Sequence, residues 1–316
     1  MIDADALLRG ARRPLVVGIG GGGDVVGALA TAEACRLAGA RPVLGGVTWE
    51  RRPIDPEPGP RAETEIEGAR RLARGVMAAS GDTCVRDSGV LFAESRMAAL
   101  LGDETVLVDA TLGPAELADG IEAAARELGA DLLVFVDVGG DALAHGHEPG
   151  LASPLCDALL LAAAARLEAR AGLPALGAVF GIGCDGELTP AEVLARIAEL
   201  GEAGALAGAR GLTPPVASRL DDAVEAVPTE ASAQALRCFR GELGEATIRR
   251  GRRSVQLSPV GALTFFFDPV AALGSAARLA AAVTDARDLE HANEILHGLD
   301  VYTELDYERD AAHTAP

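Results

Sequence analysis

The chain has 316 residues, which is enough for one large α/β domain or two domains of ordinary size. Its formal net charge of −19 disfavours nucleic acid and membrane surfaces as partners, because both carry negative charge. Hydrophobic residues make up 49% but aromatic residues only 3%, so the core must consist mainly of aliphatic side chains. We expect the partner to be a small polar metabolite or a metal ion.

Lysine is absent, since all 28 basic residues are arginine. This excludes pyridoxal phosphate bound through a lysine Schiff base, and it excludes a P-loop lysine, because each needs a primary amine.

Five widely spaced cysteines without a C-x-x-C pair are typical of reduced thiols in the cytoplasm. The amino terminus lacks an apolar signal core, and no uncharged apolar run reaches the roughly 18 residues of a membrane span. The sequence therefore predicts a soluble cytoplasmic protein, and base rates favour a homodimer.

Short apolar runs alternate with longer helical patterns along the chain. The predicted strands lie near 15–19, 42–47, 105–109, 132–138, 175–181 and 262–267, with weaker signals near 83–86 and 254–257. Residues 223–227 fit a short strand or a helix. The predicted helices lie near 24–38, 63–79, 115–129, 155–171, 190–200, 230–241, 269–282 and 287–297.

This alternation predicts an α/β fold of the Rossmann-like doubly wound kind, with a mostly parallel sheet and helices on both faces. We expect one domain over residues 1–309, with the segment from about 205 as an alternative appended subdomain. Residues 310–316 are predicted to form a flexible tail.

Three predicted strands end in glycine followed by aspartate. Glycine at the carboxyl edge of a parallel sheet lets backbone N–H groups approach a ligand closely. The loops therefore predict one polar ligand site, formed by Gly20, Gly21, Gly22, Gly23, Asp24, Gly139, Gly140, Gly183 and Asp185.

The middle loop carries the densest set of reactive groups. Asp137, Asp141 and His145 are candidate ligands for Mg, Mn or Zn, and His147 or Glu148 is the candidate acid/base. The predicted catalytic set is Asp141, His145, His147 and Glu148. Ser153 is a further predicted ligand-binding residue. The alternative is a hydrogen-bonded loop in which Ser153 starts the next helix and Asp157 supports its first turn.

The first loop also fits a dinucleotide fingerprint. Gly18, Gly20 and Gly23 have its spacing, but Asp24 occupies the helix start, and Glu50 comes late for the acid that binds the ribose. Arg51 and Arg52 follow the second strand, where arginine can bind a phosphate group. Asp109 adds an acid at the same edge. An aspartate at a helix start is also a normal cap.

The carboxyl-terminal run from Tyr302 to Glu308 could cover the site or pack on the last helix, and we expect packing.

Three segments together resemble an uncharacterised family of archaea and actinobacteria, the domain of unknown function 1152. They are the Gly-Ile-Gly-Gly-Gly-Gly-Asp-Val-Val-Gly run, the Asp-Val-Gly-Gly-Asp loop continuing to Ser-Pro-x-x-Asp, and the closing Tyr-Thr-Glu-x-Asp-Tyr-Glu. The likeness runs nearly end to end and implies no activity. The middle loop is also similar to the calcium loop of nucleoside hydrolases, although it lacks the adjacent aspartate pair.

Four hypotheses follow from these residues. The first is an enzyme, a hydrolase or group transferase, that acts with a divalent cation on a nucleoside, nucleotide or sugar-phosphate-like metabolite. The second is an NAD(P)-dependent oxidoreductase that uses the glycines and Glu50. The third is an S-adenosylmethionine-dependent methyltransferase. The fourth is a non-catalytic metabolite-binding protein.

Overall fold

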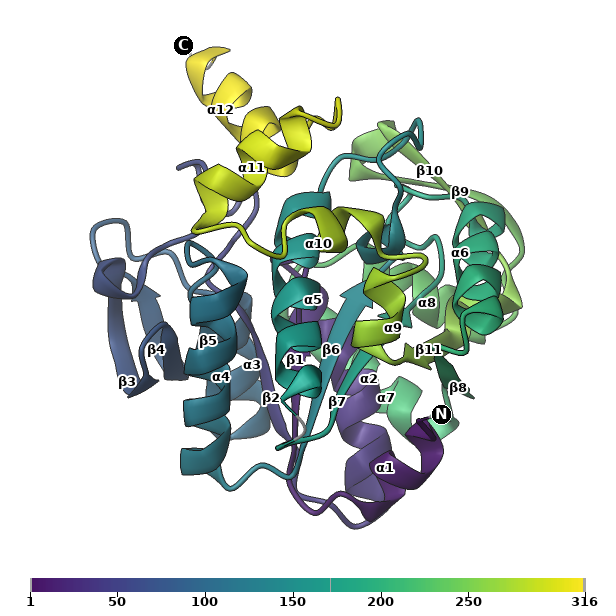
Figure 1. Ribbon diagram of the computed structural model, residues 1–316, viewed down its shortest axis with the longest axis horizontal. Coiled ribbons are helices and arrows are strands. Elements are labelled where there is room, and N and C mark those ends of the chain that lie inside the picture. The colour runs from purple at the N-terminus through teal and green to yellow at the C-terminus, as the bar shows by residue number, and fades with distance from the viewer. Residues whose placement is uncertain (1, 171, 315–316) are drawn as a thin grey trace.

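A nine-stranded sheet forms the centre of the molecule. The computed structural model describes residues 2–170 and 172–314 (Figure 1). The strand order is β3-β4-β5-β2-β1-β6-β7-β11-β8. The five strands from β5 to β7 are parallel to one another, whereas β4 and β11 pair antiparallel with β5 and β7. The predicted doubly wound, mostly parallel sheet is confirmed.

The elements have the following bounds. The strands are β1 (Pro14–Gly18), β2 (Val43–Val47), β3 (Ile66–Ala73), β4 (Val76–Val85), β5 (Thr105–Val108), β6 (Leu132–Val138), β7 (Ala175–Phe180), β8 (Leu206–Gly211), β9 (Gly244–Ile248), β10 (Arg253–Leu257) and β11 (Leu263–Phe267). The helices are α1 (Ala4–Gly10), α2 (Asp24–Leu37), α3 (Ala93–Leu101), α4 (Pro114–Leu128), α5 (Pro154–Ala169), α6 (Pro190–Glu202), α7 (Pro214–Ala226), α8 (Ala231–Phe239), α9 (Pro269–Leu273), α10 (Arg278–Ala282), α11 (Leu289–His297) and α12 (Glu304–Thr314). Four 3-10 turns are η1 (Glu63–Glu65), η2 (Asp141–Leu143), η3 (Arg249–Gly251) and η4 (Pro259–Ala262).

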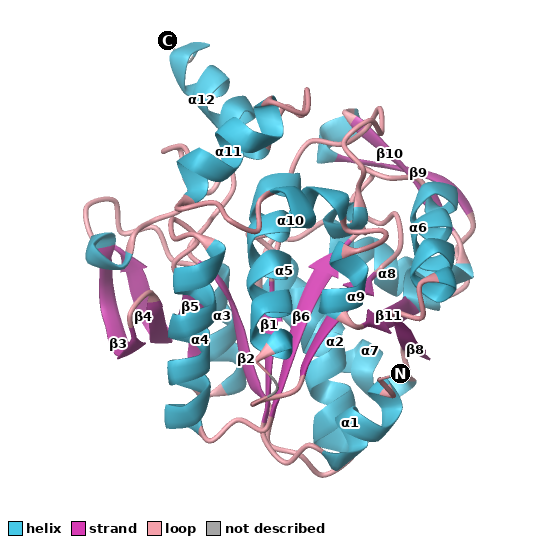
Figure 2. Cartoon of the chain, in the orientation of Figure 1, coloured by secondary structure: helices cyan, strands magenta, loops and turns pink. Residues whose placement is uncertain are grey.

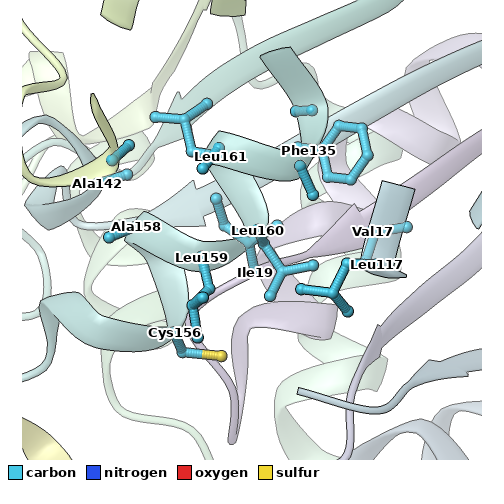
Figure 3. Packing of buried hydrophobic residues seen from close by; sticks show 14 of the residues in the cluster. Val17, Ile19, Leu117, Phe135, Ala142, Cys156, Ala158, Leu159, Leu160 and Leu161 are labelled. Carbon is cyan, nitrogen blue, oxygen red and sulfur yellow. The ribbon is translucent and has the colours of Figure 1, made fainter. Parts of the chain in front are cut away.

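Helices cover both faces of the sheet (Figure 2). Successive residues of a strand point to opposite faces, so Leu15 and Val17 pack against α4 and α5, whereas Val16 packs against α2 and α7. The helix α5 lies at the centre of its face. Figure 3 shows Leu159 to Leu161 of α5 among residues of β1, β6 and α4. Because this helix is buried almost all round, its first turn has a fixed position.

The predicted helix over 63–79 is wrong, because β3 and β4 form an antiparallel hairpin there. A two-residue connection joins the strands, and Gly75 in it has a φ of +70°. The segment is rich in alanine, arginine and glutamate, which favour a helix in isolation. Pairing of β4 with β5 extends the sheet and overrides that preference.

Other boundaries differ less. The predicted helix over 269–282 is divided into α9 and α10, and residues 223–226 continue α7. The helices α1, α3, α7 and α12 and the strands β8 and β9 were not predicted. The chain beyond 205 returns to the main sheet through β8 and β11, while β9 and β10 form a separate ribbon.

The predicted tail from 310 is helical as far as Thr314, and residues 315–316 lie outside the described part of the chain. None of the helices that the structure describes is both long enough and apolar enough to cross a membrane.

Candidate functional site

The order of the parallel strands reverses between β1 and β6. From β1 the chain continues to β2 and β5 on one side, and from β6 it continues to β7 on the other. In sheets of this kind ligands bind outside the carboxyl ends of the strands at that reversal. The loop 18–23 follows β1 and the loop 139–153 follows β6, so two of the three predicted glycine loops meet there.

Three aspartates from different elements converge at this point, and we call them the aspartate triad. Asp24 begins α2, Asp137 lies near the end of β6, and Asp157 lies in the first turn of α5. One carboxylate oxygen from each lies within 4.8 Å of the other two. This spacing is compatible with three ligands of one cation.

Two members of the triad, Asp24 and Asp157, lie close to Gly20. The Asp24 Oδ2 accepts a hydrogen bond of 2.9 Å from the Gly20 N–H. A Cβ atom on Gly20 would lie 2.6 Å from the Asp24 Oδ2 and 2.9 Å from the Asp157 Oδ2, and no such atom fits at these distances. Glycine at this position is therefore needed for both carboxylates to occupy the site.

Asp157 itself is not engaged by the protein. Its side chain is 1% exposed, and its Oδ1 has no hydrogen-bond partner in the part of the chain that the structure describes. An unpaired buried carboxylate is costly in free energy, and a proton or a cation removes that cost.

A second group of acids adjoins the triad and consists of Asp141, Asp185 and Glu187, again with one oxygen of each within 4.8 Å of the others. The two groups interact through their charges, because the carboxylate of Asp137 is one of the neighbours that raise the pKa of Asp141.

The second group is built on the two shorter glycine loops. The Gly139 carbonyl accepts a hydrogen bond of 2.8 Å from the Gly183 N–H, which ties the loops together. Gly139 has a φ of +131°, and a Cβ atom there would lie 2.3 Å from the Asp185 Cγ. The Asp185 Oδ1 is buried and has no partner among the described residues.

Glu187, in contrast, is fully paired. It accepts hydrogen bonds from the backbone N–H groups of Ala152 and Ser153 and from the Ser153 hydroxyl. Arg253 forms an ion pair with it at 2.7 Å. Burial alone would raise the pKa of Glu187, but Arg253 and these hydrogen bonds bring it below its usual value.

The aspartates show the opposite behaviour. Burial raises the pKa of Asp24 to about 7 and that of Asp137 to about 7, in the second case with help from the charge of Asp24. Burial and neighbouring carboxylates also raise the pKa of Asp141, Asp157 and Asp185 well above the usual value. Burial therefore favours the protonated form of these aspartates, and a cation would compete with the protons for the carboxylates.

Arg51 supplies positive charge next to the triad. Its Nη2 donates to the Gly20 carbonyl and, at 3.3 Å, to the Glu304 carboxylate. The guanidinium lies 4.2 Å from the centre of the Trp49 ring, where a cation–π contact fixes it. The Arg51 Nη1 is buried without a partner among the residues described. One N–H face of Arg51 therefore remains available for an anion.

The carboxyl-terminal helix α12 completes the surroundings of Arg51. Glu304 accepts hydrogen bonds of 3.0 and 2.9 Å from the N–H groups of Leu155 and Cys156 at the start of α5. Glu308 accepts one of 3.0 Å from the Trp49 Nε1. We expected the segment from Tyr302 to Glu308 to pack on the last helix. It also contacts the site, because Glu304 and Glu308 accept these hydrogen bonds. Tyr302 and Tyr307 are exposed.

The residues 145–148 form a separate unit. Glu148 accepts hydrogen bonds from the backbone N–H groups of His145, Gly146 and His147. These bonds lower the pKa of Glu148 although burial alone would raise it. Glu148 therefore holds the loop together, and it is poorly suited to the predicted role of acid/base.

His145 faces away from the predicted metal set. Its Nε2 lies 3.1 Å from the Arg196 Nη1 and 3.1 Å from the Glu199 Oε2. Burial and the Arg196 charge lower its pKa. The predicted set of Asp137, Asp141 and His145 is not assembled, because His145 groups with His147 and Glu148 instead. His147 is exposed.

Other predicted ligand residues have contacts of their own. Glu50 accepts a hydrogen bond from the Ala93 N–H at the start of α3, and burial raises the pKa of Glu50 to about 7. Asp109 accepts one of 2.7 Å from the Glu63 N–H and another from the Thr111 hydroxyl. Both carboxylates are therefore used in holding neighbouring loops.

The remaining predicted residues frame the first loop. Gly21 and Gly22 have positive φ values, and the Gly22 N–H donates to the Trp49 carbonyl at 2.8 Å. Gly23 caps α2. Arg52 reaches the Glu308 carbonyl at 3.5 Å. Gly140, with a φ of +122°, lies against Val193.

Four residues of the site were not among the predicted ones, namely Asp157, Glu187, Arg253 and Glu304. For Asp157 the sequence offered only support of the first turn of a helix as a specific alternative, and the run Ser153-Pro154 before it is typical of a helix start. Glu187 follows Asp185 by two residues and could have been included with it. The sequence contains no signal that would place Glu304 beside α5.

The family profile described as "Protein of unknown function (DUF1152)" matches residues 15–312. The chain belongs to the DUF1152 family. This match confirms the resemblance inferred from the glycine loops and the carboxyl-terminal run. No curated protein sequence matches this DUF1152 chain, and no solved structure does. The site geometry therefore carries the functional argument.

Proposed function

We propose that this DUF1152 protein is a divalent-cation-dependent hydrolase or group transferase that acts on a small phosphorylated metabolite, such as a nucleotide or a sugar phosphate. The aspartate triad binds the cation. Arg51 binds the phosphate group of the metabolite, and Asp141, whose pKa is raised, serves as the acid/base of the chemical step.

The observation that carries this proposal is that two side chains beside Gly20, one acidic and one basic, each have a buried polar atom without a hydrogen-bond partner within the described part of the chain. The Asp157 Oδ1 and the Arg51 Nη1 are both buried and lack partners among the described residues. A cation satisfies the first and an anion satisfies the second. A metal–phosphate complex supplies both charges within one ligand.

Oxygen ligands of this kind suit Mg²⁺ or Mn²⁺ best. The triad offers only carboxylates, and Zn²⁺ prefers histidine or cysteine in most sites. A cation among three aspartates also offsets the burial and the mutual repulsion that raise their pKa values. Binding should therefore release protons.

A turn rich in arginine supports a phosphorylated substrate. Arg249, Arg250 and Arg252 lie in the connection between β9 and β10, and Arg253 begins β10. Arg253 bonds to Glu187, and Arg249 lies 4.0 Å from the same carboxylate, so the turn borders the second acid group. In a chain with a net charge of −19, this concentration of guanidinium groups favours an anionic substrate.

The hydrolytic form of the reaction uses these groups in a simple way. A cation held by Asp24, Asp137 and Asp157 would act as a Lewis acid on the phosphoryl group, and Arg51 would bind one of its oxygens. A water oxygen forms the new bond to phosphorus as the bond to the leaving oxygen breaks. The proton of the water passes to the Asp141 carboxylate and then to the leaving oxygen. In a transferase a hydroxyl group of a second substrate takes the place of water.

The NAD(P) alternative has less support. The Gly20 N–H, which a pyrophosphate would need, donates to Asp24 instead. Glu50, which would bind the ribose, is engaged by the Ala93 N–H. The acids around the loop also oppose a dinucleotide pyrophosphate unless a cation is present.

The test is an activity screen of the purified protein loaded with Mg²⁺ or Mn²⁺ against a panel of nucleotides and sugar phosphates. We expect one substrate class to be consumed, and we expect the Asp157→Asn protein to be inactive while remaining folded. Stabilisation by a phosphorylated ligand without its consumption would indicate a binding protein, and stabilisation by NAD(P) or S-adenosylmethionine alone would contradict the proposal.

A further inference from the structure

Apart from the candidate site, the surface has a hollow beside the carboxyl-terminal half of α2, whereas Asp24 lies at the amino-terminal end of that helix. It is bordered by α1, α2, α7 and β8, and Figure 1 places α1 at the end of the molecule opposite α12. Its volume is about 290 Å³. This is near the lower end of the range for small-molecule sites.

The walls of this hollow are mainly apolar. Leu8 of α1, Ala30 of α2, Val216 of α7 and Phe266 of β11 are buried side chains that line it. Ala34 and Leu37 continue the same face of α2 toward solvent. Such walls suit an aliphatic chain.

Two polar atoms in this lining are left without partners. The Thr31 Oγ1 and the Arg210 Nη1 are buried and have no hydrogen-bond partner within the described chain. Thr31 is only 2% exposed. Arg210 has an acid near its Nε, since the Asp5 Oδ1 lies at 3.6 Å, but its Nη1 remains free. Leaving such donors unpaired in a buried position is costly.

The charges around the hollow favour an anion. Two arginines, Arg9 and Arg210, and three threonines line it, and no aspartate or glutamate does. The chain carries 47 acidic residues, so a lining without acids is unusual for this protein. A lining with two arginines and no carboxylate is also incompatible with a cation site.

We propose that this hollow binds a small monocarboxylate with an aliphatic chain of about six to ten carbons. The carboxylate accepts hydrogen bonds from the Arg210 Nη1 and the Thr31 hydroxyl, and the chain contacts Leu8, Val216 and Phe266. A phosphate group fits less well, because it needs more donors than one guanidinium edge and a hydroxyl, and because the remaining walls are apolar.

The test uses sodium octanoate as the probe and isothermal titration calorimetry as the measurement. Octanol has the same chain without the charge, and acetate has the charge without the chain. We expect octanoate to bind at least about 10-fold more tightly than either, because both parts of the hollow are then used. Equal binding of octanol and octanoate, or no binding of octanoate at millimolar concentration, would overturn the proposal.

Two substitutions locate the site. Arg210→Gln should weaken octanoate binding by about 10-fold or more, and Thr31→Val should weaken it by roughly threefold to 10-fold with almost no change in volume. The matched control is Arg219→Gln, which removes an arginine from α7 that does not line the hollow. Unchanged affinity in both Arg210→Gln and Thr31→Val would place the ligand elsewhere and contradict the assignment.

Thr31→Val keeps the proposal testable if Arg210→Gln fails to fold. Stabilisation by Mn²⁺ should be the same in both variants as in the wild type, which separates this site from the proposed metal site. A second copy of the chain is another occupant that would cover an apolar hollow. If gel filtration showed a dimer that Ala34→Arg dissociates, and if octanoate did not bind, the carboxylate assignment would be wrong.

Discussion

Arg51 and Asp157 meet at the same glycine. The Arg51 guanidinium donates to the Gly20 carbonyl, and the Asp157 Oδ2 lies 2.9 Å from the place that a Cβ atom on Gly20 would occupy. A positive and a negative group from different elements, each with one buried atom unpaired among the described residues, thus lie against the same loop. This arrangement suits a ligand that carries both charges.

Asp157→Asn should separate metal binding from folding. The amide keeps the shape of the side chain but is a weak cation ligand, so the thermal stabilisation of the wild type by Mn²⁺ or Mg²⁺ should disappear. The metal-free variant should melt roughly 2–6 °C higher than the wild type at pH 8, because the amide is neutral without binding a proton and avoids the cost of burying the carboxyl group. Differential scanning fluorimetry measures both effects.

Asp285→Asn is the matched control for this substitution. The Asp285 side chain is 96% exposed and pairs with Arg166 at the surface, so its loss should change neither property. If Asp157→Asn retained the full stabilisation by the cation, the triad would not be the binding site.

The stability of the metal-free protein should fall as the pH rises from 5 to 7. Asp24 and Asp137 have pKa values of about 7 in the folded protein, but near 4 in the unfolded chain. Between these values the folded state holds more protons, so the free energy of unfolding decreases as the pH rises toward about 7. Thermal melts across this range, with and without Mn²⁺, measure the effect.

The cation should reduce that slope, because it replaces the protons. Glu148 and Glu187 have lowered pKa values, so their stabilising contribution is lost only as the pH falls below about 4.5 and does not affect this window. A metal-free melting temperature that rose between pH 5 and pH 7 would contradict the assignment of the protons to the aspartates.

Gly20→Ala should destabilise the protein by about 1–3 kcal/mol and weaken cation binding, because the added Cβ atom displaces Asp24 and Asp157. The control is Gly10→Ala at the end of α1, where a Cβ atom meets nothing within 4 Å. That change should be neutral or slightly stabilising. Chemical denaturation gives the free energies. Equal effects from the two substitutions would mean that the contacts at Gly20 are not decisive.

Arg51→Gln should abolish the binding of inorganic phosphate to the Mg²⁺-loaded protein. Arg51 presents an unpaired Nη1, whereas its neighbour Arg52 reaches only the Glu308 carbonyl at 3.5 Å. Arg52→Gln should therefore weaken phosphate binding less than about threefold, against 10-fold or more for Arg51→Gln. Isothermal titration calorimetry compares them, and a larger effect at Arg52 would reverse the assignment.

Glu148→Gln should lower stability without changing the affinity for the cation. The carboxylate of Glu148 accepts three backbone hydrogen bonds in its own loop, and an amide replaces them poorly. We expect a loss of about 1–3 kcal/mol in the free energy of unfolding. If the variant instead lost catalysis at unchanged stability, Glu148 would have the acid/base role that the sequence first suggested.

The alternation of apolar strands and helices predicted the parallel centre of the sheet, because buried strands such as β6 and β7 are continuous apolar runs. The hairpin of β3 and β4 was not predicted, since residues such as Arg70 and Arg71 lie at the sheet edge in a segment that favours a helix in isolation. Antiparallel pairing with β5 decides its structure.

Some residues of the candidate site could likewise be predicted from the sequence, whereas others could not. Asp137 lies near the end of β6, and the glycine loops after β1 and β7 lead to Asp24 and Asp185, so topology alone brings the three to one edge. His145 and Glu148 lie in a long loop whose course depends on side chains such as Arg196, and sequence spacing could not indicate it. Glu304 is placed by the packing of α12, which depends on contacts far apart in the chain.

The most direct measurement is anomalous diffraction from crystals of the protein grown or soaked with Mn²⁺. The proposed function predicts one strong anomalous peak coordinated by carboxylate oxygens of Asp24, Asp137 and Asp157, and no such peak in the Asp157→Asn protein. A fully occupied Mn²⁺ elsewhere, or a triad that stays free of metal at saturating Mn²⁺ and pH 8, would contradict it.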